Sequence, residues 1–234
     1  MVKAVQVRSF PVQTTRVGAY ELIKQAILSG DFQPGQLLTE ISLAEWCGTS
    51  RTPIREALRR LQQDGLVEKL DRGFYVMRRS PEEILDIYDT RVILEAEAAK
   101  VAADRRSPHD ISRLKLELER SFKLDGKDLE KMVESNEVFH QLIWHSTRNE
   151  CLIDLLERIQ LHLGRYRGAS LLSRGSTLAM PGRWSESLEQ HREIFESIEA
   201  RDSQRAYDQM VNHLMKARAL REVLNSEEVL KARY

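Results

Sequence analysis

The chain has 234 residues, and its 36 Lys and Arg are balanced by 36 Asp and Glu, so the formal net charge is zero. This length is sufficient for two domains of ordinary size. The two cysteines, Cys47 and Cys151, are too few for a disulfide framework and fit a reducing compartment. No apolar run approaches a membrane span, and the first residues lack the apolar core of a signal peptide. We therefore expect a soluble protein of the cytoplasm.

The charge is distributed unevenly along the chain. The first 80 residues carry 12 Lys and Arg against 8 Asp and Glu, whereas the rest carry 24 against 28. Only the first part has the sign expected of a nucleic-acid-binding protein. The composition changes near Ser80, a typical helix cap, and Pro81, a typical first helical residue. We therefore expect one domain over residues 1–79 and a second over residues 80–234.

The N-terminal residues precede a single predicted helix. Residues 1–15 lack a helical period and are interpreted as an arm. Tyr20, Ile23 and Ile27 then share one face of a helix that ends at Gly30, before a Pro-Gly turn.

The stretch from Leu37 to Val76 predicts two consecutive helices separated by a glycine turn. Thr39 or Ser42 can cap the first helix, and Ser42 has the capping-box spacing to Glu45. Gly48 lies where the chain must adopt a backbone conformation that other residues rarely adopt.

The second of these helices has two chemically distinct faces. Arg51, Arg55 and Arg59 recur every four residues and therefore share one side. The opposite side is apolar and consists of Ile54, Leu58 and Leu61. A helix of this kind packs by one side and presents guanidinium groups on the other, as a recognition helix in a DNA major groove must do. The alternative is a solvated basic helix in an unrelated helical protein.

A β-hairpin is predicted directly after this helix. The apolar runs Leu66–Leu70 and Phe74–Met77 flank Asp71-Arg72-Gly73, which we interpret as a three-residue turn with glycine last. Arg72 lies at its tip. The order of helix, turn, helix and hairpin predicts a winged helix-turn-helix, and the combination of order, spacing and turn chemistry favours DNA binding.

The stretch from Tyr20 to Val76 resembles the DNA-binding domain of the GntR superfamily of bacterial transcription regulators. Its markers are the G-x-x-x-PG turn at Gly30–Gly35, the L-x-E-x-x-LA block at Leu38–Ala44, SRTPIREAL at Ser50–Leu58, and the wing glycine Gly73.

The resemblance implies roles for individual residues. In this family the arginines that match Arg51 and Arg55 contact DNA, and the wing tip, here Arg72 and Gly73, reaches the neighbouring groove. Some members carry a further DNA-contacting arginine where this chain has Ile41, so its base preference need not follow theirs. The complete set of residues that we expect to contact DNA is Arg51, Thr52, Arg55, Arg59, Arg72 and Gly73.

From Pro81 onward nearly every segment has a helical period, and strand signals are absent. Six helices are predicted, and Ser170–Arg183 is interpreted as a loop between the fourth and the fifth. Phe122 and Leu155 are among the side chains expected to face inward. The expected fold is mainly α: a winged helix-turn-helix with a small hairpin wing, followed by an antiparallel bundle of about six helices.

Three helices of this bundle each turn one histidine inward: His140, His191 and His213. Asn136 lies one turn before His140 on the same face. Taken singly, each histidine is interpreted as a hydrogen-bonded core residue. Three imidazoles and a side-chain oxygen on facing helices, however, form a ligand set that suits zinc, nickel and similar divalent ions.

Residues 81–224 resemble the FCD domain, the helical effector domain of the FadR-like branch of the same superfamily. Many members bind a metal through an Asp or Asn four residues before a first histidine, and through two histidines on the last two helices. NEVFH, EQHREIF and DQMVNHL match that pattern here and imply the ligands Asn136, His140, His191 and His213. Asn136 is a weaker oxygen donor than the commoner aspartate. Members that sense fatty acyl groups lack these histidines, so the match points away from that class.

The resemblance also implies a small effector. An ion with open coordination positions binds a carboxylate directly. Arg91 lies on the inward face of the first bundle helix and can pair with that carboxylate in bidentate fashion. The alternative is a salt bridge to Glu95, one turn away, and the sequence does not choose between the two.

Two functions agree with these observations. The first is a transcription regulator, most often a repressor, which binds operator DNA as a homodimer in the cytoplasm at the nucleoid and responds to a small carboxylate metabolite. The second is a metal-dependent enzyme of small organic acids fused to a DNA-binding module. The chain has neither an H-E-x-x-H pattern nor a glycine-rich phosphate loop, so we expect no catalytic residues.

Overall fold

The structure, a computed structural model, describes residues 18–172 and 182–231. The chain divides between Arg78 and Arg79 into two compact units. The predicted N-terminal arm and residues 173–181 of the predicted loop lie outside the described residues. Within the described ranges, no helix combines the length and the apolar composition needed to cross a lipid bilayer.

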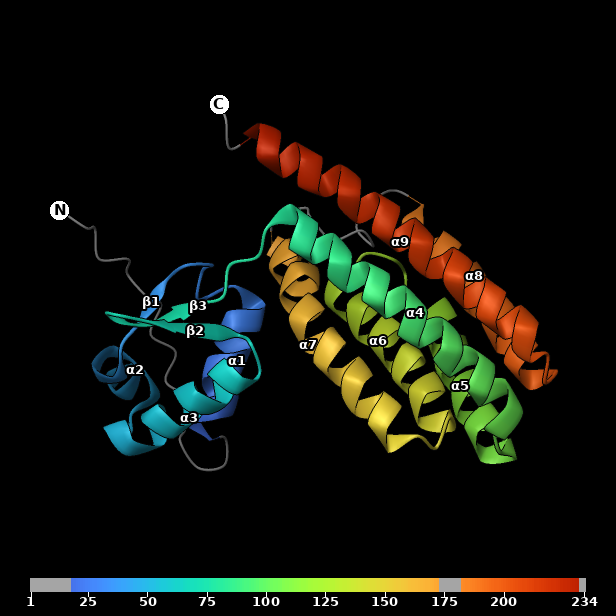
Figure 1. Cartoon of the computed structure of the whole chain (residues 1–234). Helices are drawn as coiled ribbons and strands as arrows, with labels where there is room; N and C mark the ends of the chain where they lie inside the picture. Colours follow the sequence, from blue (N-terminus) through green and yellow to red (C-terminus); the bar gives the residue numbers. More distant parts are fainter. Residues whose placement is uncertain (1–17, 173–181, 232–234) are drawn as a thin grey trace. The chain divides into compact units, whose positions relative to one another are not determined.

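The first unit combines three helices with a three-stranded antiparallel sheet of order β1-β3-β2 (Figure 1). Its elements are α1 (Ala19–Ser29), β1 (Leu37–Leu38), α2 (Glu40–Cys47), α3 (Arg51–Gln63), β2 (Val67–Leu70) and β3 (Gly73–Val76). Helices α2 and α3 with the hairpin β2–β3 form the predicted winged helix-turn-helix, which confirms the fold class of this part of the chain.

Local signals set the limits of α2. Thr39 is its N-cap, and the Thr39 hydroxyl oxygen accepts a hydrogen bond of 3.1 Å from the backbone N–H of Ser42. The alternative cap, Ser42, is therefore wrong, because Ser42 already lies in the first turn of the helix. The helix ends at Gly48, whose φ of 63° lies in the left-handed region that a side chain disfavours.

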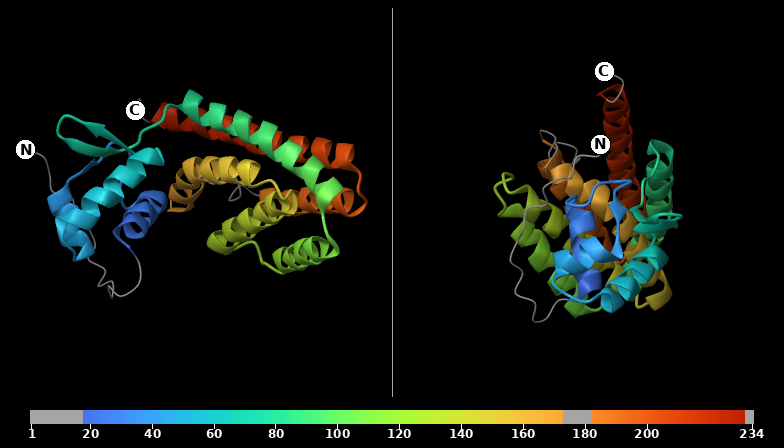
Figure 2. Two further views of the ribbon diagram at one scale, coloured as in Figure 1. Left: turned by 60° about the horizontal axis from the view of Figure 1, so that its bottom comes forward. Right: turned by 90° about the vertical axis from the view of Figure 1, so that its left-hand side faces the viewer.

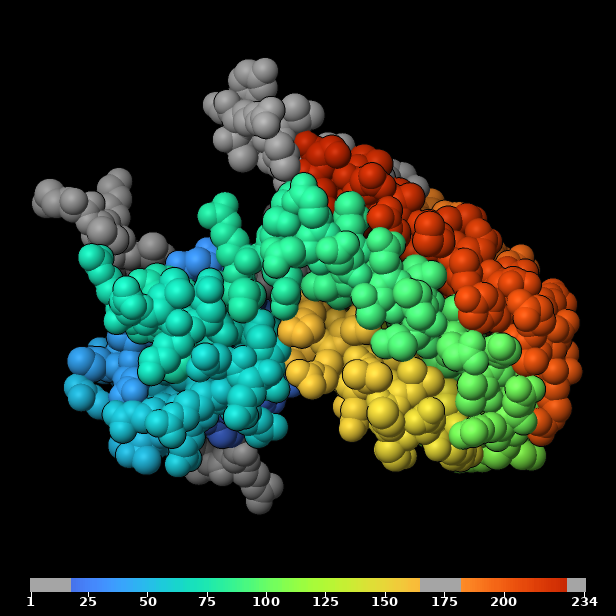
Figure 3. Space-filling view, viewed as in Figure 1, coloured from blue at the N-terminus to red at the C-terminus, as the bar shows by residue number. Residues whose placement is uncertain are grey.

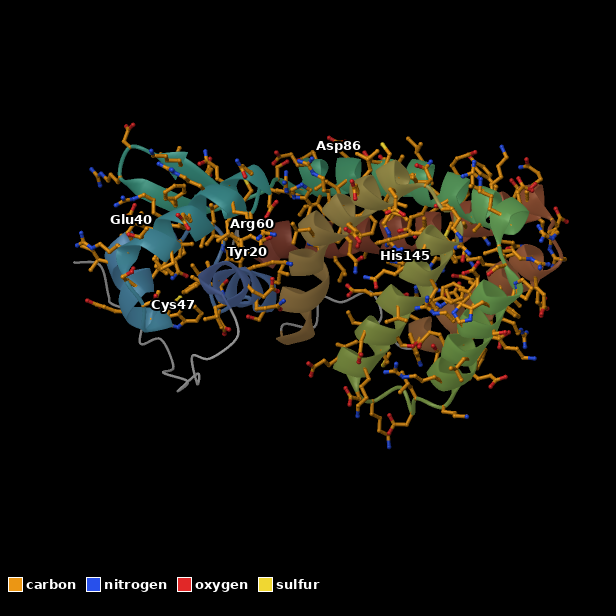
Figure 4. All side chains as sticks on the ribbon, turned by 90° about the horizontal axis from the view of Figure 1, so that it is seen from below. Tyr20, Glu40, Cys47, Arg60, Asp86 and His145 are labelled. Carbon is orange, nitrogen blue, oxygen red and sulfur yellow. The ribbon has the colours of Figure 1, made fainter. Side chains whose placement is uncertain are left out.

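Helix α3 joins the core of this unit by the predicted apolar face, because Ile54, Leu58 and Leu61 are completely buried. A polar contact also ties α3 to α1. The Tyr20 hydroxyl donates to the Asp64 carboxylate at 2.6 Å, and the Arg60 guanidinium lies 3.9 Å above the Tyr20 ring (Figure 4). Partial burial and the hydrogen bond to Asp64 raise the pKa of Tyr20 to about 12.

The hairpin differs from the prediction in two respects. Leu70 pairs directly with Gly73, so the turn contains only Asp71 and Arg72 rather than three residues. The prediction also missed β1, which pairs with β3 in the register Leu37↔Tyr75. Two residues are too short a run to produce a recognisable alternation, and only the neighbouring strand β3 makes this segment a strand.

In its described residues the second unit consists of six helices, as predicted, which confirms the all-α class. They are α4 (Pro81–Arg105), α5 (Pro108–Phe122), α6 (Leu129–Ser146), α7 (Glu150–Leu172), α8 (Arg183–Glu199) and α9 (Ser203–Lys231). Capping boxes begin α4 and α5: Ser80 accepts from the Glu83 N–H, and Ser107 accepts from the Asp110 N–H.

Helices α4 and α9 form the most extensive helix pair of this unit and run side by side in Figures 1 and 2. The Asn225 amide donates to the Pro81 carbonyl at 3.2 Å, so the end of α9 meets the start of α4 and the two helices are antiparallel. Completely buried alanines of α4, among them Ala99 and Ala103, allow this close approach. Figure 3 shows both helices along one face of the unit.

Four predictions for this unit are wrong in detail. Phe122 is 44% exposed because it is the last residue of α5, where it borders an open pocket with Leu118 and Phe195. Leu155 is 46% exposed because the buried face of α7 is centred on Ile153 and Leu156. The predicted loop Ser170–Arg183 is also too long at both ends. Helix α7 continues to Leu172, and α8 begins at Arg183 rather than at Ser185.

The burial of α3 leads to a prediction about stability. Leu58→Ala removes a completely buried side chain and should lower the free energy of unfolding of the first unit by about 2–5 kcal/mol. Urea unfolding followed by circular dichroism measures this change. Gln62→Ala, at an exposed position of the same helix, is the control and should change stability by less than about 0.5 kcal/mol. Equal effects of the two substitutions would contradict the packing described above.

Candidate metal centre and nucleic-acid interface

The candidate nucleic-acid interface is the outer face of α3. Arg51, Thr52, Arg55 and Arg59 are all exposed, whereas the apolar residues of the same helix are buried. The hairpin turn adds the exposed Arg72, followed by the half-buried Gly73. The exposed face of α3 thus carries several guanidinium groups and a threonine hydroxyl. These hydrogen-bond donors can contact phosphates and base edges when the helix lies in a major groove.

Arg55 is held in place by Glu40, which begins α2. The Arg55 Nε donates to Glu40 Oε1 at 2.8 Å and its Nη2 donates to Oε2 at 2.7 Å, a bidentate ion pair between the two helices. The hydrogen bond lowers the pKa of Glu40 and raises that of Arg55. The labelled Glu40 lies on α2 in Figure 4. Sequence analysis used Glu40 only as a family marker and missed this contact.

At the position where some regulators carry a further arginine, Ile41 is 54% exposed. An apolar side chain there offers methyl groups instead of hydrogen-bond donors.

The candidate metal centre lies inside the second unit, where three imidazoles converge. His140 comes from α6, His191 from α8 and His213 from α9, and one ring nitrogen of each lies within 4.8 Å of the others. Their ring centroids are 4.8–5.3 Å apart. All three are buried, at 1%, 1% and 3% exposure. We call this group the histidine triad.

Two members of the triad are oriented by polar neighbours. The Nδ1 of His140 lies 2.5 Å from Glu95 Oε2, and the Nδ1 of His213 lies 2.9 Å from Gln190 Oε1. Because both neighbours accept hydrogen bonds there, each Nδ1 carries the proton and each Nε2 keeps its lone pair. Partners of this kind are typical behind metal-binding histidines.

The third member, His191, has a buried nitrogen without a partner. Its ring stacks on Phe139 at a centroid distance of 4.1 Å, and its Nε2 has no hydrogen-bond partner among the described residues. Burial lowers the pKa of His191 and of His213 well below the usual value, and the nearby guanidinium groups of Arg183 and Arg91 act in the same direction. Neutral imidazoles with available lone pairs are the form that binds a metal, so the residues present fit a divalent ion.

Arg91 occupies the same interior and is 5% exposed. It pairs with Glu95 one turn away on α4, which is the salt bridge that sequence analysis left open. Its Nη2 also lies 3.5 Å from the Nε2 of His140. Burial acts to raise the pKa of Glu95, but the charge of Arg91 and the hydrogen bonds from His140 and Arg91 outweigh it and hold that pKa well below its usual range. The guanidinium therefore borders the triad while remaining neutralised by Glu95.

Asn136 and the remaining histidines of this unit differ in their surroundings. Asn136 is 8% exposed and lies one turn before His140 on α6. His109 and His145 are exposed, and His162 lies beside Arg79, with its Nδ1 3.1 Å from a guanidinium nitrogen, so these three histidines are separate from the triad.

Two residues next to the triad, Gln190 and Arg183, could not be recognised from the sequence. Gln190 directly precedes His191 in the sequence. Its position within a helix does not indicate that it contacts His213, which lies on another helix. Arg183 was assigned to a loop, whereas it is the first residue of α8 and is 4% exposed. A buried arginine cannot be recognised from helical spacing when the start of the helix is misplaced.

The sequence matches two family models. Residues 15–76 match the model described as bacterial regulatory proteins, gntR family, and residues 86–216 match the FCD domain. Together they cover most of both units.

Individual relatives agree with these matches. The chain is 30% identical over 199 residues to the uncharacterized HTH-type transcriptional regulator YdhC of Bacillus subtilis, covering 83% of this chain and 85% of the relative. It is 28% identical over 207 residues to the HTH-type transcriptional repressor GlaR of Escherichia coli, covering 86% and 93%. Its fold is similar to the solved structure of E. coli McbR/YncC, with a TM-score of 0.71 at 22% identity over 90% of this chain and 96% of that one.

The triad leads to a prediction about metal content. His191→Ala removes an imidazole nitrogen that is buried without a partner among the described residues, and should reduce the zinc or nickel retained by the purified protein by about tenfold or more. Elemental analysis after dialysis against metal-free buffer measures it. His145→Ala, an exposed histidine of α6, is the matched control and should retain the metal content of the unaltered protein. Full metal content in His191→Ala, with circular dichroism showing a folded protein, would contradict the site.

Proposed function

Because the chain belongs to the gntR family of bacterial regulatory proteins and carries an FCD domain, we propose that a small carboxylate bound at the histidine triad controls how tightly it binds operator DNA. The chain is a DNA-binding transcription regulator, as its relatives are. This decides against the alternative of a metal-dependent enzyme. Repression is the proposed direction, because the relative GlaR is named a transcriptional repressor.

The proposed DNA contacts are those of the outer face of α3 and of the hairpin turn. Arg55, oriented by its contact with Glu40, hydrogen-bonds a base edge or a phosphate. Arg51 and Arg59 lie one helical turn before and after it on the same face. Arg72, in the turn, contacts the adjacent groove. A homodimer would place two such helices in successive major grooves, about 34 Å apart.

The proposed metal ligands are His140, His191 and His213, with Asn136 as the oxygen donor from the preceding turn of α6. The observation that carries this proposal is the buried Nε2 of His191, which has no hydrogen-bond partner among the described residues. It lies in the triad beside His140 and His213, whose Nδ1 atoms contact Glu95 and Gln190. A bound divalent ion supplies a Lewis-acidic centre for a carboxylate oxygen. Arg91 supplies a guanidinium beside the triad for the same carboxylate.

Continuity of the chain suggests how the effector acts on DNA binding. Arg91 and Glu95 belong to α4, and α4 begins at Pro81, only a few residues after the wing strand β3 ends at Val76. A carboxylate that competes with Glu95 for Arg91 weakens the ion pair within α4 and adds a contact between α4 and the effector. If the two resulting arrangements differ in their affinity for DNA, effector binding shifts the population between them.

The recognition face leads to a prediction about operator affinity. Arg55→Ala should weaken binding to DNA from upstream of the protein's own gene by about 1–3 kcal/mol, because a charged bidentate donor is lost. Fluorescence anisotropy with a labelled duplex at fixed salt measures this. Arg113→Ala removes the same charge from an exposed position of α5 and is the control. If both variants bind like the unaltered protein, Arg55 does not contact DNA.

The regulatory proposal is tested on the same complex. For the zinc- or nickel-loaded full chain, a member of a panel of small carboxylates should change duplex affinity by about fivefold or more, the usual range of an allosteric coupling. Removing the metal with a chelator should abolish the response without abolishing DNA binding. A response of equal size in the metal-free protein would reject the metal as part of the effector site.

A further inference from the structure

Helix α8 carries a buried polar stripe that continues beyond the triad. Arg183, Ser187 and His191 follow one another at intervals of four residues, and Gln190 lies beside them, so the four share one face of the helix. Their exposed fractions are 4%, 0%, 1% and 5%. Further along α8 the buried residues include Ile194, Ile198 and Ser197, and the Ser197 hydroxyl donates to the Glu193 carbonyl at 2.8 Å. The stripe in the first half of the helix differs because some of its polar atoms have no partner among the described residues.

Two polar atoms of this stripe have no hydrogen-bond partner among the described residues and are not explained by a metal. They are the Nε of Arg183 and the Oγ of Ser187. Buried polar groups in proteins are almost always hydrogen-bonded, and an unsatisfied buried donor costs about 1–3 kcal/mol. Two such donors at successive turns, next to the partnerless Nε2 of His191, indicate a place where a ligand supplies the missing acceptors.

The Arg183 guanidinium is linked directly to the triad. Its Nη1 donates to Gln190 Oε1 at 3.3 Å, and the same oxygen accepts from the Nδ1 of His213 at 2.9 Å. One amide oxygen thus separates the guanidinium from a ring of the proposed metal centre. Arg183 and the triad therefore share a hydrogen-bond acceptor.

The charge of Arg183 is only partly compensated in the interior. Its acidic partner, Glu186, lies 3.2 Å away but has a side chain that is 46% exposed, and it also accepts from Lys216 at 2.8 Å. By contrast, Arg91 has the buried carboxylate of Glu95 as its partner. A divalent ion at the triad would add further positive charge beside both guanidinium groups. A buried cation of this kind is stabilised by an anion that hydrogen-bonds it.

We propose that the effector of this chain is a short dicarboxylate, which places one carboxylate at the triad and Arg91 and the other at Arg183 and Ser187. This rests on the function proposed above and adds the class of effector. Ser187 and His191 are one helical turn apart, about 6 Å along the axis. Two or three carbons between the carboxyl groups span such a distance, whereas a monocarboxylate leaves Arg183 and Ser187 without an acceptor.

Isothermal titration calorimetry of the metal-loaded full chain tests the proposal with malonate, succinate and glutarate against butyrate, which has the carbon count of succinate but one carboxylate. At least one diacid should bind about tenfold or more tightly than butyrate. Arg183→Gln and Ser187→Ala should each remove most of that preference while leaving metal content and butyrate affinity unchanged. Arg192→Gln, at a half-exposed arginine of the same helix, is the control and should preserve the preference.

The outcomes separate this inference from the function on which it rests. If butyrate and the diacids bind equally, or if both variants keep the preference for a diacid, the role of Arg183 and Ser187 is rejected although the metal and carboxylate site stands. If no carboxylate binds to protein that contains its metal, the proposed function itself fails, and the inference with it. Ser187→Ala keeps the volume of the side chain nearly unchanged, so it remains informative if Arg183→Gln does not fold.

Discussion

The burial of three imidazole rings at the centre of the helical unit is the constraint on which the rest of that unit depends. A partner stabilises a buried ring nitrogen, and for two of the three rings the partner lies on another helix: Glu95 of α4 for His140, and Gln190 of α8 for His213. Helices α4, α6, α8 and α9 are thereby joined by directional contacts as well as by apolar packing. Such contacts orient the rings, which apolar packing alone does not do.

The electrostatics of the interior give a physical reason for coupling between metal and effector. The buried Arg91–Glu95 pair is neutral as a whole, and burial lowers the pKa of His191 and His213 and so favours their neutral forms. A divalent ion therefore enters an interior that holds no surplus of negative charge among the residues described around it. In the proposed function an anionic effector would restore the balance and would itself be held by the ion and the guanidinium groups, so that each would stabilise the binding of the other.

At the surface of the DNA-binding unit, an arginine is also oriented by a carboxylate. Arg55 is oriented by a bidentate contact with Glu40, whereas no ion pair is found for Arg51 or Arg59 among the described residues. An oriented guanidinium loses less side-chain entropy on binding, but its carboxylate partner opposes the approach of phosphates. The ion pair with Glu40 therefore favours hydrogen bonds that match the fixed orientation of the Arg55 guanidinium over contacts that only neutralise a phosphate charge. The Tyr20–Asp64–Arg60 contacts support the same helix from the side of α1.

The sequence by itself determined the order of the helices and the hairpin, because caps, turns and helical periodicity are local properties. The two-faced α3, the capping boxes at Ser80 and Ser107 and the inward histidines of α6, α8 and α9 were all recognisable in this way. Periodicity was less reliable where a helix is covered on one side only or comes to its end. It therefore predicted burial for Leu155 and Phe122, both of which are exposed.

Only the tertiary structure decided which side chains meet across elements. The pairing of Glu40 with Arg55, of Glu95 with His140 and of Gln190 with His213 joins residues that are 15, 45 and 23 positions apart. The two-residue strand β1 likewise exists only through its neighbour β3. The physical reason is that spacing along a helix or strand determines the direction in which a side chain points, whereas its partner is determined by how the helices and strands pack against one another.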